Sequence, residues 1–163
     1  MLIHPIKPLY NNEAEILILG SFPSVKSREE GFFYGHPQNR FWKVMARICN
    51  ESLPATIEEK TNMILKHHFA LWDVIHSCEI IGSADSTIKN VTPNDLSKIL
   101  NAANIKAVCV NGKKAEALYK KYMFNETGIK AIVLPSTSPA NASWNEDRLF
   151  EFWSNAISAI KNN

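Results

Sequence analysis

Four short apolar segments divide the chain and constrain its fold more than any other feature. They are residues 14–20 (AEILILG), 69–75 (FALWDVI), 106–112 (KAVCVNG) and 130–135 (KAIVLP). Each segment has the length and apolar density of a strand that is buried on both faces. Longer stretches with helical spacing of apolar residues separate them. Strands and helices that alternate in this way predict a parallel sheet covered by helices on both faces.

The helices are predicted by apolar periodicity and by capping residues. Phe41 and the apolar residues that follow it recur at helical spacing, and a Ser or Thr followed by Glu three residues later is a capping box. Helices are therefore expected after Asn39, from Thr56 to about 68, from Thr92 to about 103, over 113–122 and from Ser143 onward. The prediction is one three-layer α/β/α domain over 1–163, built on a central four-stranded parallel sheet.

Composition is compatible with such a domain and restricts its chemistry. With 163 residues, 45% of them apolar, the chain can bury a core without disulfides or a metal. Cys49, Cys78 and Cys109 form no Cys-x-x-Cys pair, so zinc and iron–sulfur sites are not predicted, and a reducing cytoplasm is expected. No apolar run of about 18 residues predicts a membrane span. The net charge of +2 neither indicates nor excludes nucleic acid.

The ligand site is predicted at the carboxyl ends of the strands, where open α/β sheets bind their ligands. Three of the four apolar segments run into Gly or Pro and then into polar loops. A site should therefore be built from residues 20–39, 111–113 and 135–142.

The first loop carries aromatic side chains and an amide. Phe32, Phe33 and Tyr34 could stack on a planar ring or pin the loop to the domain, and Asn39 has the place and residue type of an N-cap. Arg40 on the following helix has no acidic neighbour, which suits either a solvated face or an edge that meets phosphates.

The second loop, from Ser136 to Asn141, is rich in short hydroxyl side chains that suit either a phosphate contact or an ordinary turn. Lys113 adds positive charge near the same edge. A P-loop, a Gly-x-Ser-x-Gly elbow and a histidine metal site are not supported by the spacing of the candidate residues.

Three blocks together resemble the uracil-DNA glycosylase superfamily. They are Gly20-Ser21-Phe22-Pro23-Ser24, then Tyr34-Gly-His36-Pro37-Gln38-Asn39-Arg40-Phe41-Trp42, and Leu134-Pro-Ser136-Thr-Ser138-Pro139-Ala-Asn141. Mismatch-specific uracil glycosylases carry Asn at the third position of the first block, where this chain has Phe22. That substitution is similar to the hypoxanthine-DNA (deoxyinosine) glycosylase branch, whose catalytic residue is the Asn of the second block.

The resemblance implies a role for each matched residue. Asn39 would be the catalytic residue, and Tyr34 stands where an aromatic stacks on the extruded base. Base contacts are implied for Ser21, Phe22, Pro23, Ser24, Tyr34 and Gly112. DNA contacts are implied for Ser136, Thr137, Ser138, Pro139, Ala140, Asn141, Arg40 and Lys113.

The function implied is that of a monofunctional glycosylase that needs no cofactor and no metal. Its substrate would be double-stranded DNA with a deaminated or mispaired base, its product would pass to abasic-site repair enzymes, and it would act as a monomer in the cytoplasm, at the nucleoid. A uracil or G:T/U mismatch-specific glycosylase and a non-catalytic nucleic-acid-binding α/β module remain alternatives. A flavodoxin-like enzyme is disfavoured by the lack of a Gly-rich phosphate loop.

Overall fold

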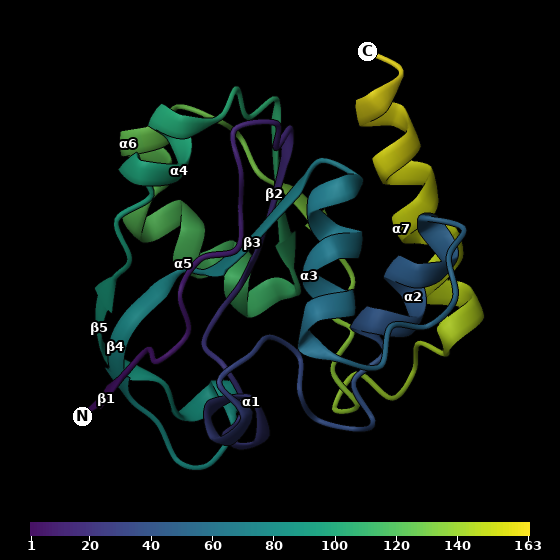
Figure 1. Ribbon diagram of the computed structural model, residues 1–163. Coiled ribbons are helices and arrows are strands. Elements are labelled where there is room, and N and C mark those ends of the chain that lie inside the picture. Colours follow the sequence, from purple (N-terminus) through teal and green to yellow (C-terminus); the bar gives the residue numbers. More distant parts are fainter.

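A computed structural model describes residues 1–163 and contains the predicted parallel sheet (Figure 1). The sheet consists of β2 (Ile16–Gly20), β3 (Phe69–Asp73), β6 (Ala107–Asn111) and β7 (Ile132–Leu134), in the order β3-β2-β6-β7 with all neighbours parallel. Each apolar segment thus forms one strand, as predicted. The second segment was expected to continue to Ile75, but β3 ends at Asp73.

Alternate side chains of β2 enter two separate cores, because successive residues of a strand point to opposite faces. Ile16 and Ile18 pack beneath α2 (Phe41–Ile48), α3 (Ile57–Lys66) and α7 (Glu146–Lys161). Leu17 and Leu19 pack in the other core with residues of α4 (Ser97–Ala102) and α5 (Lys113–Tyr122), which the short α6 (Phe124–Thr127) follows. Figure 1 shows the two groups of helices on opposite sides of the sheet, so the three-layer prediction is confirmed.

A second, antiparallel sheet was not predicted. It consists of β1 (Leu2–Ile3), β4 (Ile75–Glu79) and β5 (Lys89–Pro93) in the order β1-β4-β5, and a 3-10 turn, η1 (Asp85–Thr87), lies between β4 and β5. The helix expected to start at Thr92 is therefore wrong at its beginning. Pro93 ends β5, and α4 starts at Ser97, whose N–H is accepted by the Asp95 carboxylate.

The chain passes from one sheet to the other at Val74, between β3 and β4. The Asn94 amide group holds this junction, because its Nδ2 donates to the carbonyl oxygens of Asp73 and Ile75 at 2.9 and 3.1 Å. The backbone N–H of Asn94 also donates to Val74. The side chain of Asp73, the last residue of β3, is thereby fixed at the carboxyl edge of the parallel sheet.

Two further details differ from the prediction. Asn145, rather than Ser143, caps α7 by accepting the N–H of Arg148, and the first long loop contains a helix, α1 (Val25–Glu30), capped by Ser24.

The three cysteines are buried and unpaired, and burial raises the pKa of Cys49 to about 11 and of Cys109 to about 12. None of the helices combines the length and apolar character that crossing a membrane requires.

Candidate active site

A pocket of about 320 Å³ opens at the carboxyl edge of the parallel sheet, where the sequence predicted the site. Its volume lies at the lower end of the range of small-ligand sites, roughly 300–1,000 Å³. It is lined by residues that end or follow strands of the parallel sheet, together with the loop before α2 and the loop before β5. They are Gly20, Ser21, Phe22, Pro23, Ser24, Ser27, Phe33, Tyr34, His36, Asn39, Asp73, Ser83, Asp85, Asn111, Ser136, Thr137, Ser138, Pro139 and Ala140.

The Asp73 carboxylate reaches this pocket because Gly20, opposite it on the neighbouring strand, has no side chain. The two residues are register partners of β2 and β3. A Cβ on Gly20 would lie 2.5 Å from Asp73 Oδ1 and 3.3 Å from the Tyr34 hydroxyl oxygen. Such a contact with the carboxylate is far below van der Waals distance, so glycine is required here while Asp73 keeps this position.

His4 holds the other oxygen of this carboxylate. Its Nε2 lies 2.7 Å from Asp73 Oδ2, and the two side chains are only 1% and 6% exposed. His4 Nδ1 accepts the backbone N–H of Ile6, so the imidazole proton must sit on Nε2 and is donated to Asp73. The ring also packs edge-on against Phe22 and Trp72. Asp73 Oδ2 is therefore occupied, and Oδ1 is left to the pocket.

Tyr34 combines two unfavourable features that the fold nevertheless maintains. Its backbone lies in the left-handed region with φ of 53°, and its hydroxyl oxygen is buried without a hydrogen-bond partner. One ring face stacks on Phe41, with centroids 3.9 Å apart. Burial, with a further contribution from Asp73, raises the pKa of the hydroxyl, which is therefore a neutral donor. Strain and unsatisfied polar groups of this kind are typical of functional residues.

The Asn39 amide is oriented by the backbone that follows it. Its Oδ1 accepts the N–H of Phe41 at 2.9 Å, an Asx turn, while Arg40 occupies the N-cap position of α2. Because an N–H can only donate to the oxygen, this contact identifies which amide atom is which. The Nδ2 atom makes no hydrogen bond within the protein, so Asn39 offers a free donor in addition to its remaining oxygen lone pair.

The two loops on either side of the pocket are joined through Thr137. Asn111, at the end of β6, bonds both the N–H and the hydroxyl of Thr137, at 3.1 and 3.0 Å. The Arg40 N–H donates to the Thr137 carbonyl. The Arg40 guanidinium donates to the carbonyls of Thr137 and Ser138 and to those of Asn141 and Trp144. The hydrogen-bond donors of Arg40 are therefore occupied by the loop before α7.

The first loop supplies further donors. The backbone N–H groups of Ser21 and Phe22 make no hydrogen bond within the protein, so both are free for a ligand. The Ser21 hydroxyl donates to Asp85 Oδ1 at 3.1 Å. Desolvation raises the pKa of Asp85, and the bond from Ser21 acts in the opposite direction. The side chain of Phe22 is buried, so this residue can offer only its backbone to the pocket.

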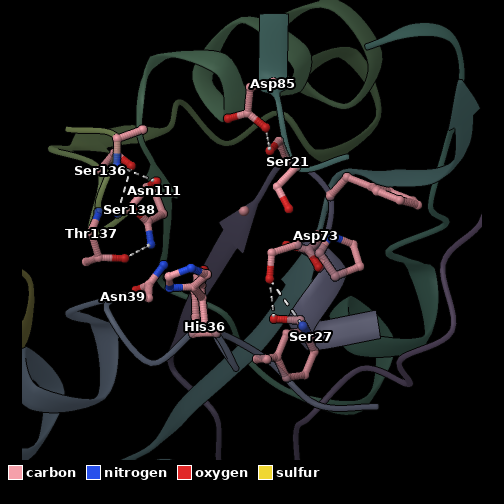
Figure 2. Close-up of a pocket in the computed structure, with 18 of the residues that line it drawn as sticks. Ser21, Ser27, His36, Asn39, Asp73, Asp85, Asn111, Ser136, Thr137 and Ser138 are labelled. Atoms are coloured by element: carbon pink, nitrogen blue, oxygen red, sulfur yellow. Dashed lines mark hydrogen bonds between the residues drawn. The ribbon is translucent and has the colours of Figure 1, made fainter. Parts of the chain in front are cut away.

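Most of the residues expected at the site come together in the pocket. Gly112, Asn141, Arg40 and Lys113 do not line it. Gly112, with φ of 97°, lies behind it, where a Cβ would be 3.1 Å from the Ser136 Cβ. Figure 2 shows Asn39 and His36 on the side of the Ser136–Ser138 loop, with Asp73 and Ser21 across the pocket from them.

Sequence reasoning did not assign His4, Asp73 or Asp85 to the site, and it included Asn111 only within the range 111–113, without a role of its own. Asn111 and Asp73 are polar residues near the carboxyl ends of two predicted apolar segments, and this position is the one signal that could have identified them. His4 has no such signal, because its contact with Asp73 spans 69 residues of sequence. No Lys or Arg lines the pocket, whereas Asp73 and Asp85 do. The pocket therefore suits a neutral or cationic group and disfavours a phosphate.

Known proteins with related sequences match almost the whole chain. The profile of the uracil DNA glycosylase superfamily matches residues 7–160. A hypoxanthine DNA glycosylase of Methanosarcina acetivorans is 35% identical over 87% of this chain and 90% of its own length. One of Methanosarcina barkeri is 32% identical over 82% and 85%.

The fold comparison agrees. A solution NMR structure from Methanosarcina acetivorans, described as that of a candidate uracil DNA glycosylase, superposes with a TM-score of 0.81 at 30% identity and covers 98% of this chain and 99% of that chain. The resemblance in the three sequence blocks is therefore confirmed: the chain belongs to the uracil DNA glycosylase superfamily, in its hypoxanthine DNA glycosylase branch.

Proposed function

We propose that this chain is a monofunctional DNA glycosylase that releases a deaminated base, with hypoxanthine favoured, from double-stranded DNA. The target nucleotide must leave the helix, because its glycosidic bond is inaccessible within the base stack. The pocket receives the flipped base, and the abasic product passes to abasic-site repair enzymes. We further propose that the enzyme acts as a monomer at the nucleoid.

The reaction is hydrolysis at C1′ of the deoxyribose. The C1′–N bond breaks with its electrons going to the base, and the oxygen of a water molecule forms a new bond to C1′. The water loses a proton and the departing base gains one, so the products are a free base and an abasic site. The sugar carries positive charge in the transition state, and the base carries negative charge.

Asn39 is the proposed catalytic residue, and its role is to orient the water. An amide is a poor base, so proton removal is not its contribution. Its side chain is fixed by the Phe41 N–H and keeps a free Nδ2, which supports a positioning role at the sugar. The free N–H groups of Ser21 and Phe22 are the proposed donors to the departing base, where negative charge develops.

The single observation that carries this function is the polarity of the pocket. It combines amides, hydroxyls, aromatic rings and two carboxylates without a Lys or Arg. A nucleotide-binding module would place a cation or a Gly-rich loop on the phosphate. A pocket with carboxylates alone fits a neutral base that is attached to a sugar developing positive charge.

Contacts to the DNA backbone are proposed outside the pocket. Lys113 is exposed at the start of α5 and suits a phosphate. Ser136, Ser138, Pro139 and Ala140 lie at the rim, where this loop would press into the helix. Arg40 and Asn141 would act on DNA through the same loop, because Arg40 bonds the Asn141 carbonyl. Gly112 would act by admitting Ser136.

The test is base release from double-stranded oligonucleotides that contain one deoxyinosine, scored by strand cleavage in alkali. Matched strands with uracil or unmodified adenine in the same place define the preference, and uracil release would support the mismatch-specific alternative. Asn39→Ala should slow single-turnover release about 100-fold or more while affinity for DNA is kept. Asn125→Ala, at an exposed position of α6, is the matched control.

Two results would overturn the proposal. One is the absence of free base from every deaminated strand, which would leave a non-catalytic DNA-binding protein. The other is an Asn39→Ala enzyme that releases base as fast as the Asn125→Ala control, which would remove Asn39 from the mechanism.

A further inference from the structure

We propose that Asp73 and Tyr34 together read the edge of the base, and that His4 is the positioning residue that makes Asp73 a pure acceptor there. The proposal rests on the glycosylase function above and names the groups that give it selectivity. Hypoxanthine has an N1–H donor beside an O6 acceptor. Adenine has an N1 acceptor beside an amino donor. A site that offers one acceptor and one donor distinguishes them.

The acceptor is Asp73 Oδ1. Its partner oxygen, Oδ2, already receives the proton of His4 Nε2, whose tautomer is fixed by the Ile6 N–H. Oδ1 faces the space beside Gly20 and has no hydrogen bond within the protein. Taking the N1–H of hypoxanthine would satisfy this oxygen at the pocket surface, whereas the N1 lone pair of adenine would be held against it.

The donor is the Tyr34 hydroxyl. It is the one buried side-chain polar atom of the protein without a partner, and burial keeps it protonated. Both this oxygen and Asp73 Oδ1 lie within 3.3 Å of the point where a Cβ on Gly20 would be. The two oxygens are therefore no more than about 6 Å apart, which allows both to face one edge of a base. Donation to O6 requires the base to meet Tyr34 by its edge, in place of stacking on its ring.

A structural role alone does not account for these features. A hydrogen bond between His4 and Asp73 that only anchored the N-terminal segment would not need Gly20 to remain open. It would also not leave the neighbouring hydroxyl unsatisfied in a residue with φ of 53°. Each of these is costly, and all three occur at one point of the pocket floor. Guanine presents the same N1–H and O6 groups as hypoxanthine, so these two contacts do not reject it. Guanine must instead be excluded by its stronger base pairing, which opposes flipping.

The experiment compares two bases on each enzyme. One strand carries deoxyinosine, and the other carries deoxynebularine, whose unsubstituted purine has no O6 and presents N1 as an acceptor. The ratio of their single-turnover rates is measured for wild type, Tyr34→Phe, Asp73→Asn and the double variant His4→Ala/Asp73→Asn. Tyr122→Phe and Asp147→Asn, at residues that do not line the pocket, are matched controls. Dividing the rates removes any loss of folded enzyme, because it affects both substrates equally.

Wild type should prefer deoxyinosine, and Tyr34→Phe should lower the ratio roughly tenfold through loss of the O6 contact. Asp73→Asn should lower it roughly 10- to 100-fold. In that variant the His4 Nε2–H still donates to the side-chain oxygen of residue 73. The new NH₂ group is therefore turned toward the base, where it can donate to N1 of nebularine. Removing His4 as well frees the amide to rotate, so the double variant should recover part of the deoxyinosine preference.

An unchanged ratio in Asp73→Asn overturns the inference, and an unchanged ratio in Tyr34→Phe removes the hydroxyl from it. A double variant with the same ratio as Asp73→Asn removes the positioning role of His4. If the variants do not fold, wild-type affinity for uncleavable 2′-fluoro-arabino strands decides, because equal affinity for the two bases contradicts the proposal. Release of neither base by wild type would instead contradict the glycosylase function.

Discussion

At the scale of single residues, the residues of the pocket floor depend on one another for their positions. Gly20 is open so that the Asp73 carboxylate can approach, and His4 holds that carboxylate in place. Phe22 covers His4 edge-on, which explains why an aromatic side chain occupies a loop whose backbone alone faces the pocket. Changing one of these residues should therefore alter the effect of changing another.

The first residue-scale prediction concerns Gly20→Ala. The added Cβ meets Asp73 Oδ1 at 2.5 Å, so the free energy of unfolding should fall by roughly 1–3 kcal/mol. In an Asp73→Ala background the obstacle is gone, and the same substitution should cost much less. Urea denaturation of the wild type, the two single variants and the double variant gives the coupling free energy between the two substitutions. Equal costs in the two backgrounds would show that the carboxylate does not occupy this space.

A second residue-scale prediction separates stability from function at Tyr34. Tyr34→Phe deletes a buried hydroxyl that has no partner, so it should raise the free energy of unfolding by about 1 kcal/mol. Tyr119→Phe is the opposite control, because its hydroxyl bonds Thr127 and the Ile129 carbonyl at 2.6 Å and its loss should destabilise. Thermal denaturation measures both. A destabilised Tyr34→Phe protein would mean that this hydroxyl is satisfied.

At the scale of elements, the loop between β7 and α7 is held by α2 through Arg40. The guanidinium donates to four carbonyls of residues 137–144, and a lysine could satisfy fewer of them because it lacks the planar fork of donors. Arg40 was expected at a phosphate-facing edge. Its contacts instead support a role in shaping the loop that approaches the DNA.

Salt dependence distinguishes these roles. Arg40→Gln should lower kcat/KM for deoxyinosine DNA about tenfold or more through a displaced loop, yet leave the dependence of DNA affinity on salt unchanged, because no phosphate contact is lost. Lys113→Gln should weaken binding to every sequence and reduce the salt slope by about one. Fluorescence anisotropy over a series of salt concentrations tests both. A reduced slope for Arg40→Gln would show that Arg40 contacts a phosphate.

Local signals predicted elements well where local physics decides them. The Thr56 capping box and the helix at 113–122 are present as expected. Thr92 and Pro93 show the opposite case, because a good helix start was overridden by pairing of β5 with β4. Pro93 lacks an N–H and is tolerated at the end of this edge strand. β4 and β5 are neighbours along the chain, but neither has the apolar alternation of a strand, so no local rule indicates their pairing.

At the scale of the whole molecule, stability should depend on the two cores that flank the parallel sheet. Leu149 on α7 is fully buried in one of them, whereas Phe152 on the same helix is 46% exposed. Leu149→Ala should therefore cost roughly 2–5 kcal/mol of unfolding free energy, and Phe152→Ala much less. Calorimetry compares the two. Similar losses would indicate that Leu149 of α7 does not pack in this core.

The overall architecture was predictable because the same pattern, an apolar segment followed by a helix, recurs along the chain. The pocket was predictable in place, at the strand ends, but not in its floor. Strand β4 contains His76 and Ser77, and β5 contains Lys89 and Asn90, so neither has the apolar alternation that identifies a strand. The antiparallel sheet and the contact between His4 and Asp73 depend on tertiary pairing, which composition does not reveal.

Strand β1 has a two-residue ladder to β4, and His4 follows it directly. Such a small edge opens far more readily than the central strands. An affinity tag fused ahead of Met1, or clipping by an aminopeptidase, therefore acts first on the group that orients Asp73. Enzyme preparations that differ only in their first few residues should therefore differ in their ratio of deoxyinosine to deoxynebularine release.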